Sequence, residues 1–382
     1  MLVHRLLAPG PVAVPPAVLE VLARPAVHHR TAEFRAAFER ARARLAELLL
    51  VDGDDVLIVG GSGTSAFEAA LLASVPAGAT VVSAHAGKFG ERWGQMARAF
   101  GYDVVEVTAP WGEAIPPEAV RQALRDHPGA AALLVTHSET STGVLHALAA
   151  IAAAARAQAP DVLVLVDAVT SAAAAELRPR AWDLDAVIAG SQKGVMLPPG
   201  LGYAWLSERA WARCPDPASR VAVFSLDLHA ERPKQRQGET LSTPPVPLVL
   251  ALDVALDALL GEPHEERWAH KARLNAAVLR GAEAVGYAPF AARPSPAVAA
   301  LTTPDGVSAK DVVRLAAARG VRIAGGQDAY AQRLVRPSVL GYVDAFDALT
   351  IVAVLEAALV DLGVAIDVGA GVAAAQRTLL AP

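Results

Sequence analysis

Short runs of apolar residues alternate with longer amphipathic segments through the first half of the chain. The runs are rich in Val, Ile, Leu and Ala and are short enough to be strands, which predicts strands buried on both faces. These predicted strands are Val56–Val59, Thr80–Ser83, Val104–Val107, Ala132–Thr136, Val162–Val166 and Ala186–Ala189.

Helical spacing of apolar residues marks the segments between these strands. The predicted helices are Ser65–Ser74, Gly90–Phe100, Pro117–Asp126, Leu148–Ala159 and Thr170–Ala175. Alternation of strand and helix is typical of an α/β fold, with a mostly parallel central sheet and helices on both faces. Such sheets bind ligands at the carboxyl ends of their strands, so candidate chemistry is sought there.

The flanking regions have a different pattern. Residues 1–25 form a proline-rich arm with one short helix, and we expect a large domain over 26–262 and a smaller α+β domain over 263–382. No prediction is made after Gly363. The elements expected outside the central alternation are helices at Pro16–Leu22, Thr31–Leu50, Pro247–Leu260, Pro263–Val285, Ala309–Arg319 and Ala345–Leu362, and strands at Ala297–Thr302 and Val321–Ala324.

Composition narrows the class of protein. Hydrophobic residues make up 53% of the chain, enough for a sizeable core, and the net charge of -5 argues against a nucleic-acid partner. Cys214 is the only cysteine, which excludes an internal disulfide and indicates a reducing compartment. No apolar run is long enough to span a membrane or serve as a signal peptide, so we expect a soluble cytoplasmic protein.

The segment Gly60-Gly61-Ser62-Gly63-Thr64 lies between a predicted strand and a predicted helix. Small residues there let a ligand approach the backbone, and exposed amides at a helix amino terminus bind anions, which predicts a phosphate site. A plain tight turn is the alternative. A dinucleotide fingerprint is a weaker one, because the strand Thr80–Ser83 ends without the acidic residue that would bind the ribose.

Asp167 and Lys193 each follow a predicted buried strand. A carboxylate at that position is costly unless it is paired, so Asp167 either caps the next helix or holds a positive heteroaromatic nitrogen. The chain has only five lysines, and Lys193 alone lies at a strand end between glycine-rich turns. Burial there would lower the pKa of its amine, as a Schiff-base nucleophile requires, although an isolated Gly-x-x-Lys is usually structural.

Together these features match the needs of pyridoxal 5'-phosphate. The cofactor requires an anchor for its phosphate, a carboxylate for its ring nitrogen and an amine for its aldehyde. The chain supplies candidates in that order, near Ser62, at Asp167 and at Lys193.

The chain resembles the class V aminotransferases of fold type I, in particular the alanine–glyoxylate and serine–pyruvate group. The resemblance extends from about residue 5 to 360. Its motifs are Pro9-Gly10-Pro11-Val12, His28-His29-Arg30, Gly61-Ser62-Gly63-Thr64, Lys88-Phe89-Gly90-Glu91-Arg92-Trp93, Ser138-Glu139-Thr140-Ser141-Thr142-Gly143, Asp167-Ala168-Val169-Thr170-Ser171, Gly190-Ser191-Gln192-Lys193, Pro198-Pro199-Gly200 and Ile323-Ala324-Gly325-Gly326.

The resemblance implies a homodimeric pyridoxal-phosphate aminotransferase that moves an amino group from an alanine- or serine-like amino acid to a 2-oxo acid such as glyoxylate or pyruvate. It implies that Lys193 bonds to the cofactor and carries the proton, and that Asp167 keeps the ring nitrogen protonated. The other residues that it implies for the cofactor are Ser62, Gly63, Thr64, Phe89, Thr140 and Gln192, with Thr243 from the second subunit. For the substrate it implies Arg336, which would bind the carboxylate, and His29 and Arg30 at the mouth of the site.

The chain departs from the family pattern near the expected substrate site. The family usually has Arg-Ile-Gly-x-x-Gly there, whereas this chain has Arg336-Pro337-Ser338-Val339-Leu340-Gly341, in which the proline restricts Arg336 to extended conformations. Thr240 and Phe224-Ser225 replace tyrosines that are common in the family.

The assigned roles have alternatives. Arg336 can be a surface arginine, and Phe89 can be a core aromatic. Elimination, substitution, retro-aldol cleavage or decarboxylation on the same cofactor is the alternative reaction, and a catalytically silent binding protein is the alternative class. His28, His29 and His137 have no recognisable ligand spacing, so no metal is expected.

Overall fold

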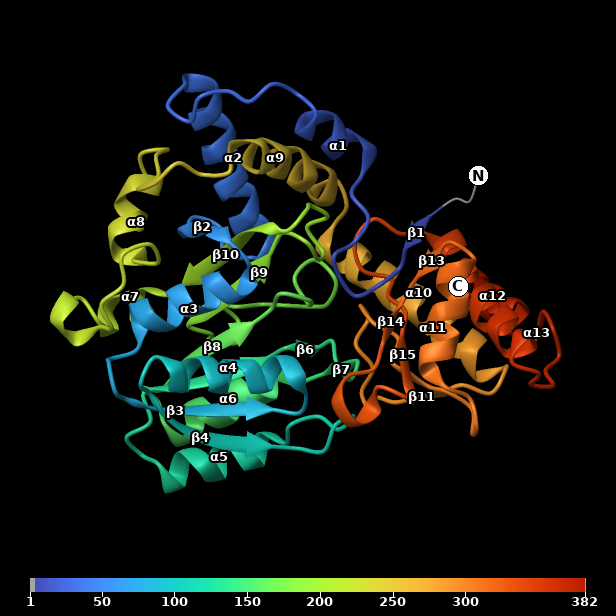
Figure 1. The fold of residues 1–382 in the computed structure, drawn as a ribbon. Coiled ribbons are helices and arrows are strands. Elements are labelled where there is room, and N and C mark those ends of the chain that lie inside the picture. Colours follow the sequence, from blue (N-terminus) through green and yellow to red (C-terminus); the bar gives the residue numbers. More distant parts are fainter. Residues whose placement is uncertain (1–3, 382) are drawn as a thin grey trace.

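The computed structural model describes residues 4–381. They form a large and a small α/β layer, each consisting of one main sheet and the helices that pack on it (Figure 1). The larger contains a seven-stranded sheet in the order β2-β10-β9-β8-β5-β3-β4. The strands of this sheet, in chain order, are β2 (Val56–Gly61), β3 (Thr80–His85), β4 (Asp103–Thr108), β5 (Ala132–Thr136), β8 (Leu163–Asp167), β9 (Ala186–Gly190) and β10 (Gly200–Leu206).

All of these strands run in one direction except β10, which pairs antiparallel with β2 and with β9. The predicted mostly parallel sheet is therefore confirmed, and each predicted strand lies within two residues of its observed bounds. No strand was predicted at β10, which separates β2 from the other parallel strands.

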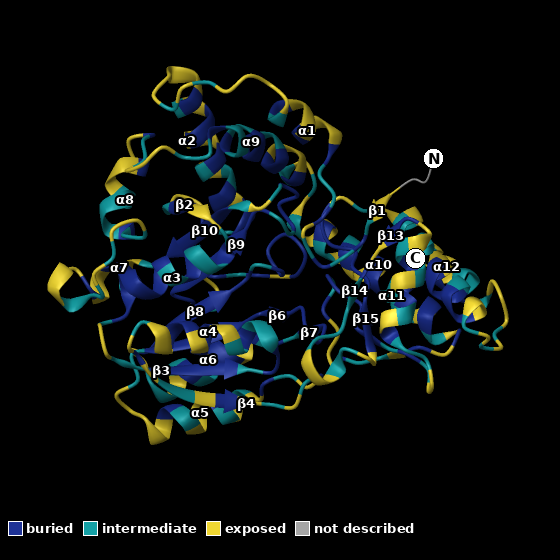
Figure 2. Ribbon diagram, in the orientation of Figure 1, coloured by how far each residue is buried: buried dark blue, intermediate teal, exposed yellow. Residues whose placement is uncertain are grey.

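Helices cover both faces of the large sheet, and in Figure 2 their outer surfaces are exposed while the central strands are buried. One face packs against α2 (Ala32–Leu48), α5 (Pro117–Asp126), α6 (Leu148–Gln158) and α9 (Val246–Leu260), with α1 (Pro16–Leu22) alongside. The other packs against α3 (Gly63–Ser74), α4 (Lys88–Ala99), α7 (Glu208–Arg213) and α8 (Leu228–Gln235).

Side chains of each strand alternate between these two hydrophobic cores. Val164 and Val166 of β8 belong to the first core, whereas Leu163 and Leu165 belong to the second. This two-residue period within an uninterrupted apolar run is expected of a strand buried on both faces.

The smaller layer begins with α10 (His264–Glu283) and is built on a four-stranded antiparallel sheet in the order β11-β12-β15-β14. Its hydrophobic core is separate from those of the large sheet. The elements after α10 are β11 (Ala288–Pro289), β12 (Leu301–Thr302), α11 (Ala309–Ala318), β13 (Val321–Arg322), β14 (Ala324–Gly325), η2 (Asp328–Tyr330), β15 (Leu334–Arg336), α12 (Ala345–Asp361) and α13 (Ala370–Leu380). The expected boundary at 262/263 falls between α9 and α10, and the boundaries 25/26 and 262/263 stay predictions.

Three predictions of local structure were wrong. Residues 170–175 form turns instead of a helix, since Ala173 has a φ of 65°, which a helix cannot accommodate. The strand expected at Ala297–Thr302 is reduced to β12, and the one expected at Val321–Ala324 is divided into β13 and β14.

The amino-terminal arm crosses from the small layer to the large one. Its strand β1 (Arg5–Leu6) pairs parallel with β13, and Ser338 N donates to the carbonyl oxygen of Leu7. Farther along, Val12 N donates to the carbonyl oxygen of Gln192 in the large layer. The arm therefore connects both layers at the point where they meet. The remaining two-stranded sheet, β6 (Ser138–Glu139) with β7 (Val144–Leu145), lies in the same region (Figure 1).

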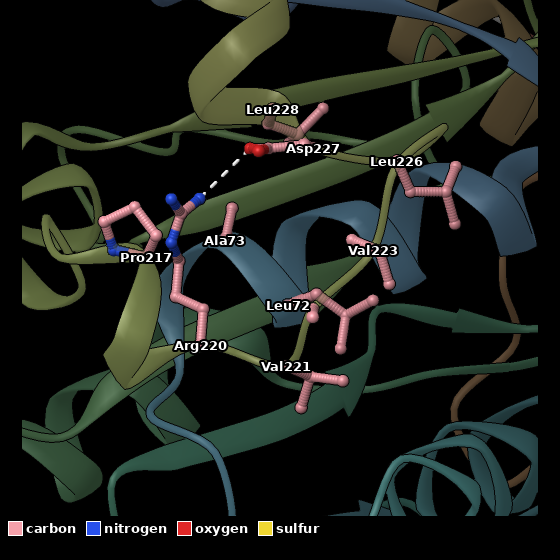
Figure 3. Close-up of a pocket in the computed structure, with 10 residues that line it drawn as sticks. Leu72, Ala73, Pro217, Arg220, Val221, Val223, Leu226, Asp227 and Leu228 are labelled. Atoms are coloured by element: carbon pink, nitrogen blue, oxygen red, sulfur yellow. Dashed lines mark hydrogen bonds and ion pairs between the residues drawn. The ribbon is translucent and has the colours of Figure 1, made fainter.

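The segment after α7 folds back over α3. It contains η1 (Pro217–Ser219) and encloses a cavity of about 170 Å³ lined by Leu72, Val221, Val223 and Leu226 (Figure 3). Arg220 pairs with Asp227 at 3.0 Å across this cavity. None of the expected site residues line it, so we do not regard it as the active site.

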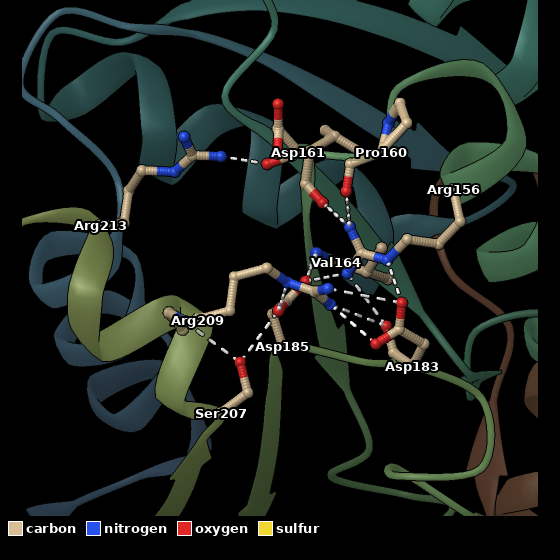
Figure 4. Close-up of polar contacts among 11 residues, drawn as sticks. Arg156, Pro160, Asp161, Val164, Asp183, Asp185, Ser207, Arg209 and Arg213 are labelled. Atoms are coloured by element: carbon tan, nitrogen blue, oxygen red, sulfur yellow. Dashed lines mark hydrogen bonds and ion pairs between the residues drawn. The ribbon is translucent and has the colours of Figure 1, made fainter.

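An ionic network fastens the amino ends of β8 and β9 (Figure 4). The fully buried carboxylate of Asp185 accepts hydrogen bonds from Arg156, from Arg209 Nε at 2.7 Å, from Ser207 Oγ at 2.9 Å and from Val164 N at 2.8 Å. These partners come from α6, β8, the N-cap of α7 and α7 itself. The network thereby aligns two strands, of which β8 ends at Asp167 and β9 ends shortly before Lys193.

Candidate active site

Most of the expected site residues line one cavity at the carboxyl ends of the parallel strands. Its volume is about 280 Å³, and the amino terminus of α3, the first turn of α4 and the loops after β6, β8 and β9 form its walls. The expected residues that it brings together are Ser62, Gly63, Thr64, Phe89, Thr140, Asp167, Gln192 and Lys193.

One end of the cavity is suited to an anion. Ser62 is the N-cap of α3 and exchanges hydrogen bonds with Ser65 in a capping box. Amides in the first turn of a helix lack partners within the helix, and the helix dipole adds positive potential there. A Cβ at Gly63 would lie 2.5 Å from Val169 Cγ2, so only glycine fits. Gln192 also lines the cavity, and its side-chain amide nitrogen can donate a hydrogen bond to an anion.

Asp167 also lines the cavity, in the last position of β8, and is buried. Its Oδ1 accepts from Val169 N at 2.8 Å, and its Oδ2 accepts from the indole Nε1 of Trp93 at 3.0 Å. Burial raises the pKa of Asp167 to about 6, against the hydrogen bonds from Val169 and Trp93, which lower it. The carboxylate is therefore mostly ionised at neutral pH and can balance a positive charge in the cavity.

Lys193 projects into the cavity from the turn after β9. Its Nζ donates a hydrogen bond to the carbonyl oxygen of Pro9, so the arm reaches the site directly. Burial lowers the pKa of Lys193 to about 8; Asp167 raises it and the charge of Arg336 lowers it further. A Cβ at Gly10 would lie 2.7 Å from Nζ, which explains why glycine stands there. An amine with such a pKa is partly neutral, and so nucleophilic, slightly above neutral pH.

Phe89 lies in the first turn of α4, at the edge of the cavity. The guanidinium of Arg92 is 5.1 Å from the centroid of its ring. The ring can stack on a flat ligand that contacts Asp167 and Lys193, since all three residues line the same cavity.

Arg336 ends β15 and is buried between the two layers. Its Nε donates to the carbonyl oxygen of Gly325 at 2.8 Å, and its Nη1 donates to that of Thr140 at 2.7 Å. Among residues 4–381, no hydrogen bond is formed by its Nη2. Arg336 is thus not a surface arginine, and it keeps donor capacity close enough to affect the pKa of Lys193.

Thr243, His29 and Arg30 lie apart from this cavity within one chain. Thr243 lines a separate polar cavity of about 190 Å³ beside Gly60. His29 and Arg30 precede α2, where Arg30 is exposed and partial burial, together with the charges of His28 and Arg30, lowers the pKa of His29.

Trp93 and Glu139 belong to the site but were not predicted. Glu139 is completely buried and accepts hydrogen bonds from the amides of Phe89 and Gly90. Both residues stood inside motifs that the resemblance was based on. Neither residue type signals a role by itself, because only the folded chain shows which groups their side chains contact.

In the part of the chain that the structure describes, His, Cys, Asp and Glu side chains form no group of three or more that could hold a metal ion. None of the helices in the same part combines the length and the apolar composition needed to cross a bilayer.

Comparison with known proteins gives matches over nearly the whole chain. A sequence model of the class V aminotransferases matches residues 18–347. The serine–glyoxylate aminotransferase of Methylorubrum extorquens is 30% identical over 98% of this chain and 96% of its own length. The protein named soluble hydrogenase, small subunit, of a Synechococcus species is 38% identical over 98% of both chains.

A solved structure has the same fold at higher identity. The aspartate aminotransferase of subgroup IV from Thermus thermophilus superposes with a TM-score of 0.87 and 40% sequence identity, over 94% of this chain and 99% of that one. The fold is therefore shared with a protein named as an aminotransferase.

Proposed function

The chain belongs to the class V aminotransferase family, and we propose that it uses pyridoxal 5'-phosphate to move the amino group of a small amino acid, alanine- or serine-like, to glyoxylate or pyruvate. One observation carries the proposal. Lys193, Asp167 and the amino terminus of α3 line a single cavity at the carboxyl ends of β9, β8 and β2.

The residues of the cavity fit this cofactor. Ser62, Gly63, Thr64 and Gln192 would hold its phosphate, since amides, hydroxyls and the helix dipole favour an anion. The glycine cradle at Gly63, which a Cβ would fill, leaves the backbone accessible. Asp167 is buried with only neutral donors around its carboxylate, so a protonated ring nitrogen would give it the cationic partner that it lacks. Phe89 would stack on the ring and Thr140 would contact its edge.

When bound, the cofactor supplies an aldehyde for the amino group and a ring that withdraws electrons from the substrate Cα. Lys193 supplies the amine that holds the cofactor and afterwards carries the proton at Cα. Asp167 keeps the ring nitrogen protonated, because its carboxylate stays ionised above its pKa of about 6. Both side chains are largely buried, and the low local polarity strengthens their interactions with a bound group.

We propose that Arg336 orients the substrate. Its Nε and Nη1 are held by the carbonyl oxygens of Gly325 and Thr140, which orients the guanidinium and leaves Nη2 without a hydrogen bond among residues 4–381. An arginine held in this way can bind an α-carboxylate, which amino acids and 2-oxo acids have in common. Pro337 restricts the backbone of Arg336 and removes a neighbouring donor, so the guanidinium has to provide most of this recognition.

The assembly that we propose is a cytoplasmic homodimer with shared active sites. Within one chain Thr243 is separate from the cavity, and the nearby side chain of Phe224 is 96% exposed. A second copy covering this region would bury Phe224, bring Thr243 to the phosphate, and bring His29 and Arg30 to the substrate mouth. Cys214, the single cysteine, is buried and free, which agrees with a reducing compartment.

We do not propose a hydrogenase activity for this chain, although the Synechococcus protein is named as a hydrogenase subunit. Metal clusters in redox enzymes are held largely by cysteine thiolates, and this chain has one cysteine. The family assignment and the lysine-containing cavity support amino transfer instead.

Visible absorption tests the proposal. The purified protein is mixed with pyridoxal 5'-phosphate, then with L-alanine, L-serine or L-aspartate, and finally with glyoxylate or pyruvate. We expect a coloured protein that is bleached by a donor and regains its colour with a 2-oxo acid. Lys193→Ala should bind the cofactor without covalent attachment and fail to turn over. Full turnover by Lys193→Ala, or no cofactor binding by the unaltered protein, would overturn the proposal.

A further inference from the structure

Glu139 is a buried carboxylate without a cationic partner. It lies at the end of β6 with none of its surface exposed. Among residues 4–381 it forms no ion pair, although its charge raises the pKa of Lys193 and of Arg336. A buried charge of this kind is stable only when its oxygens are well supplied with hydrogen bonds. The arrangement of these bonds therefore indicates its role.

Both oxygens of Glu139 are occupied by donors from two segments. Oε2 accepts from Phe89 N at 3.1 Å and from Gly90 N at 2.8 Å. Oε1 accepts from Ser141 N at 2.9 Å and from Ser141 Oγ at 2.6 Å. The hydroxyl of Ser141 in turn accepts from Lys88 N at 2.9 Å. The carboxylate thus joins the first turn of α4 to the loop that carries Thr140.

The N-cap residue of α4 does not itself accept hydrogen bonds from the first amides of the helix through a side chain. The N-cap of α4 is Gly87, which has no side chain to satisfy the first amides. A Cβ at Gly87 would lie 2.5 Å from Glu139 Cγ, so the glycine allows the carboxylate to approach. Glu139 replaces the missing cap from a neighbouring loop and sets the position of Phe89.

We propose that Glu139 is a positioning residue of the active site, which holds the Phe89 ring and the Thr140 loop in place around the cofactor. The inference depends on the proposed function, because it concerns how the pyridoxal-phosphate cavity is shaped. Glu139 itself does not line that cavity and acts through the residues whose amides it binds.

The competing explanation is that Glu139 only stabilises a helix terminus. The chain contains a matched case of such a residue, Glu356. Its buried carboxylate accepts from Gly369 N, Gly371 N and Val372 N at the start of α13, in the small layer and away from the cavity. Glu356→Gln therefore gives the effect of weakening a buried carboxylate cap alone.

The experiment compares Glu139→Gln, Glu356→Gln, Phe89→Ala and the double variant Glu139→Gln/Phe89→Ala. The measured quantities are the dissociation constant of pyridoxal 5'-phosphate and the visible circular dichroism of the bound cofactor, which reports the orientation of its ring. The midpoint of thermal unfolding of each cofactor-free protein serves as the measure of stability.

We expect Glu139→Gln to weaken cofactor binding about tenfold and to change the circular dichroism band, whereas Glu356→Gln lowers the unfolding midpoint without either effect. In the Phe89→Ala background the same Glu139 substitution should change affinity much less, because the ring that it positions is already missing.

Equal behaviour of the two Gln variants, or full additivity with Phe89→Ala, would overturn the inference. Glu139→Asp tests a purely electrostatic role, since it keeps the charge but shortens the reach to the amides. Rescue of affinity by Glu139→Asp would show that charge matters and position does not. If the unaltered protein does not bind the cofactor, the proposed function fails instead, so the two failures are distinguishable.

Discussion

The indole nitrogen of Trp93 donates a hydrogen bond to Oδ2 of Asp167 at 3.0 Å and also contacts Thr136 Oγ1 at 3.0 Å. Trp93 belongs to α4, the helix that also carries Phe89. One helix therefore positions both the aromatic ring at the cavity wall and the direction of the carboxylate at the end of β8.

Replacing Trp93 by Phe tests this hydrogen bond. The indole N–H lowers the pKa of Asp167, so its loss should raise that pKa above its present value of about 6. Phe67 stacks on Trp93 with a centroid distance of 4.2 Å, and a phenylalanine would keep this contact. We expect weaker binding of pyridoxal 5'-phosphate, by about 1 to 2 kcal/mol, with the loss growing below neutral pH. Cofactor titration as a function of pH measures this, and an unchanged acid limb would contradict it.

The lowered pKa of Lys193 predicts a stability that depends on pH. The pKa is about 8 in the folded protein, against an ordinary value of 10.5. Between these two values the unfolded chain binds more protons than the folded one, so the free energy of unfolding of the cofactor-free protein rises with pH. Relative to Lys193→Met, the free energy of unfolding of the unaltered protein should increase by up to about 3 kcal/mol from pH 8 to 10.5. Below pH 8 the difference between the two proteins should not change with pH.

Urea unfolding at several pH values checks this prediction. Lys271, whose pKa burial also lowers to about 8, is present in both proteins and cancels from the difference. A difference between the two proteins that stays constant through the alkaline window would mean that Lys193 is not protonated differently on folding.

Arg336→Lys should separate substrate binding from cofactor binding. Lysine cannot reproduce the planar fork that contacts Gly325, Thr140 and a carboxylate together. We expect KM for both the amino acid and the 2-oxo acid to rise by about tenfold or more, with little change in cofactor affinity. Arg333→Lys, in the exposed residue just before β15, is the control and should leave KM unaltered. Equal KM values in the two variants would show that Arg336 does not bind the substrate.

Mixing inactive subunits tests whether Thr243 acts across the dimer. Thr243→Asp should repel the cofactor phosphate, and Lys193→Ala removes the amine. If Thr243 serves the partner's cavity, a mixed dimer has one doubly altered and one intact site. Random mixing should then restore about a quarter of the unaltered activity, because about half of the dimers are mixed and each has one intact site. Steady-state assays after refolding the mixture measure this; no recovery would place Thr243 in the cavity of its own chain or outside the site.

Asp185→Asn should reduce stability without altering the site. The substitution leaves Arg156 and Arg209 without their shared buried carboxylate, which typically costs about 3 kcal/mol or more. We expect a lower urea midpoint and an unchanged cofactor spectrum. Asp183 is 56% exposed at its side chain, so Asp183→Asn should have a smaller effect. Similar losses in both variants would show that burial of Asp185 contributes nothing extra.

The central strands and most helices could be predicted from the sequence because each has a periodic or continuous apolar pattern. The strand β10 was missed because its glycines look like turn residues. In the structure, a Cβ at Gly202 would lie 2.4 Å from the carbonyl oxygen of Ser62, so the glycine allows α3 to pack closely on β10. This requirement arises from the tertiary contact and leaves no periodic signal.

The same reason explains why α13 was not assigned. Its sequence is rich in Ala and Gly, and it packs so closely on α10 that a Cβ at Gly371 would lie 2.6 Å from the carbonyl oxygen of Gly281. At the site, Lys193 and Asp167 stood out because an ionisable residue after an apolar run is unusual. Glu139 and Trp93 did not, since their roles depend on contacts with α4 and β8 that form only on folding.

The arm that contacts Lys193 has a consequence for the order in which the protein matures. Its strand β1 is synthesised first, but its partner β13 and the Ser338 amide that binds Leu7 come from the last part of the chain. On the ribosome the arm must therefore wait until nearly all of the polypeptide has emerged. Only then can β1 pair with β13, so the arm that carries Pro9 and Gly10 to the lysine is fixed at both of its ends late in biosynthesis.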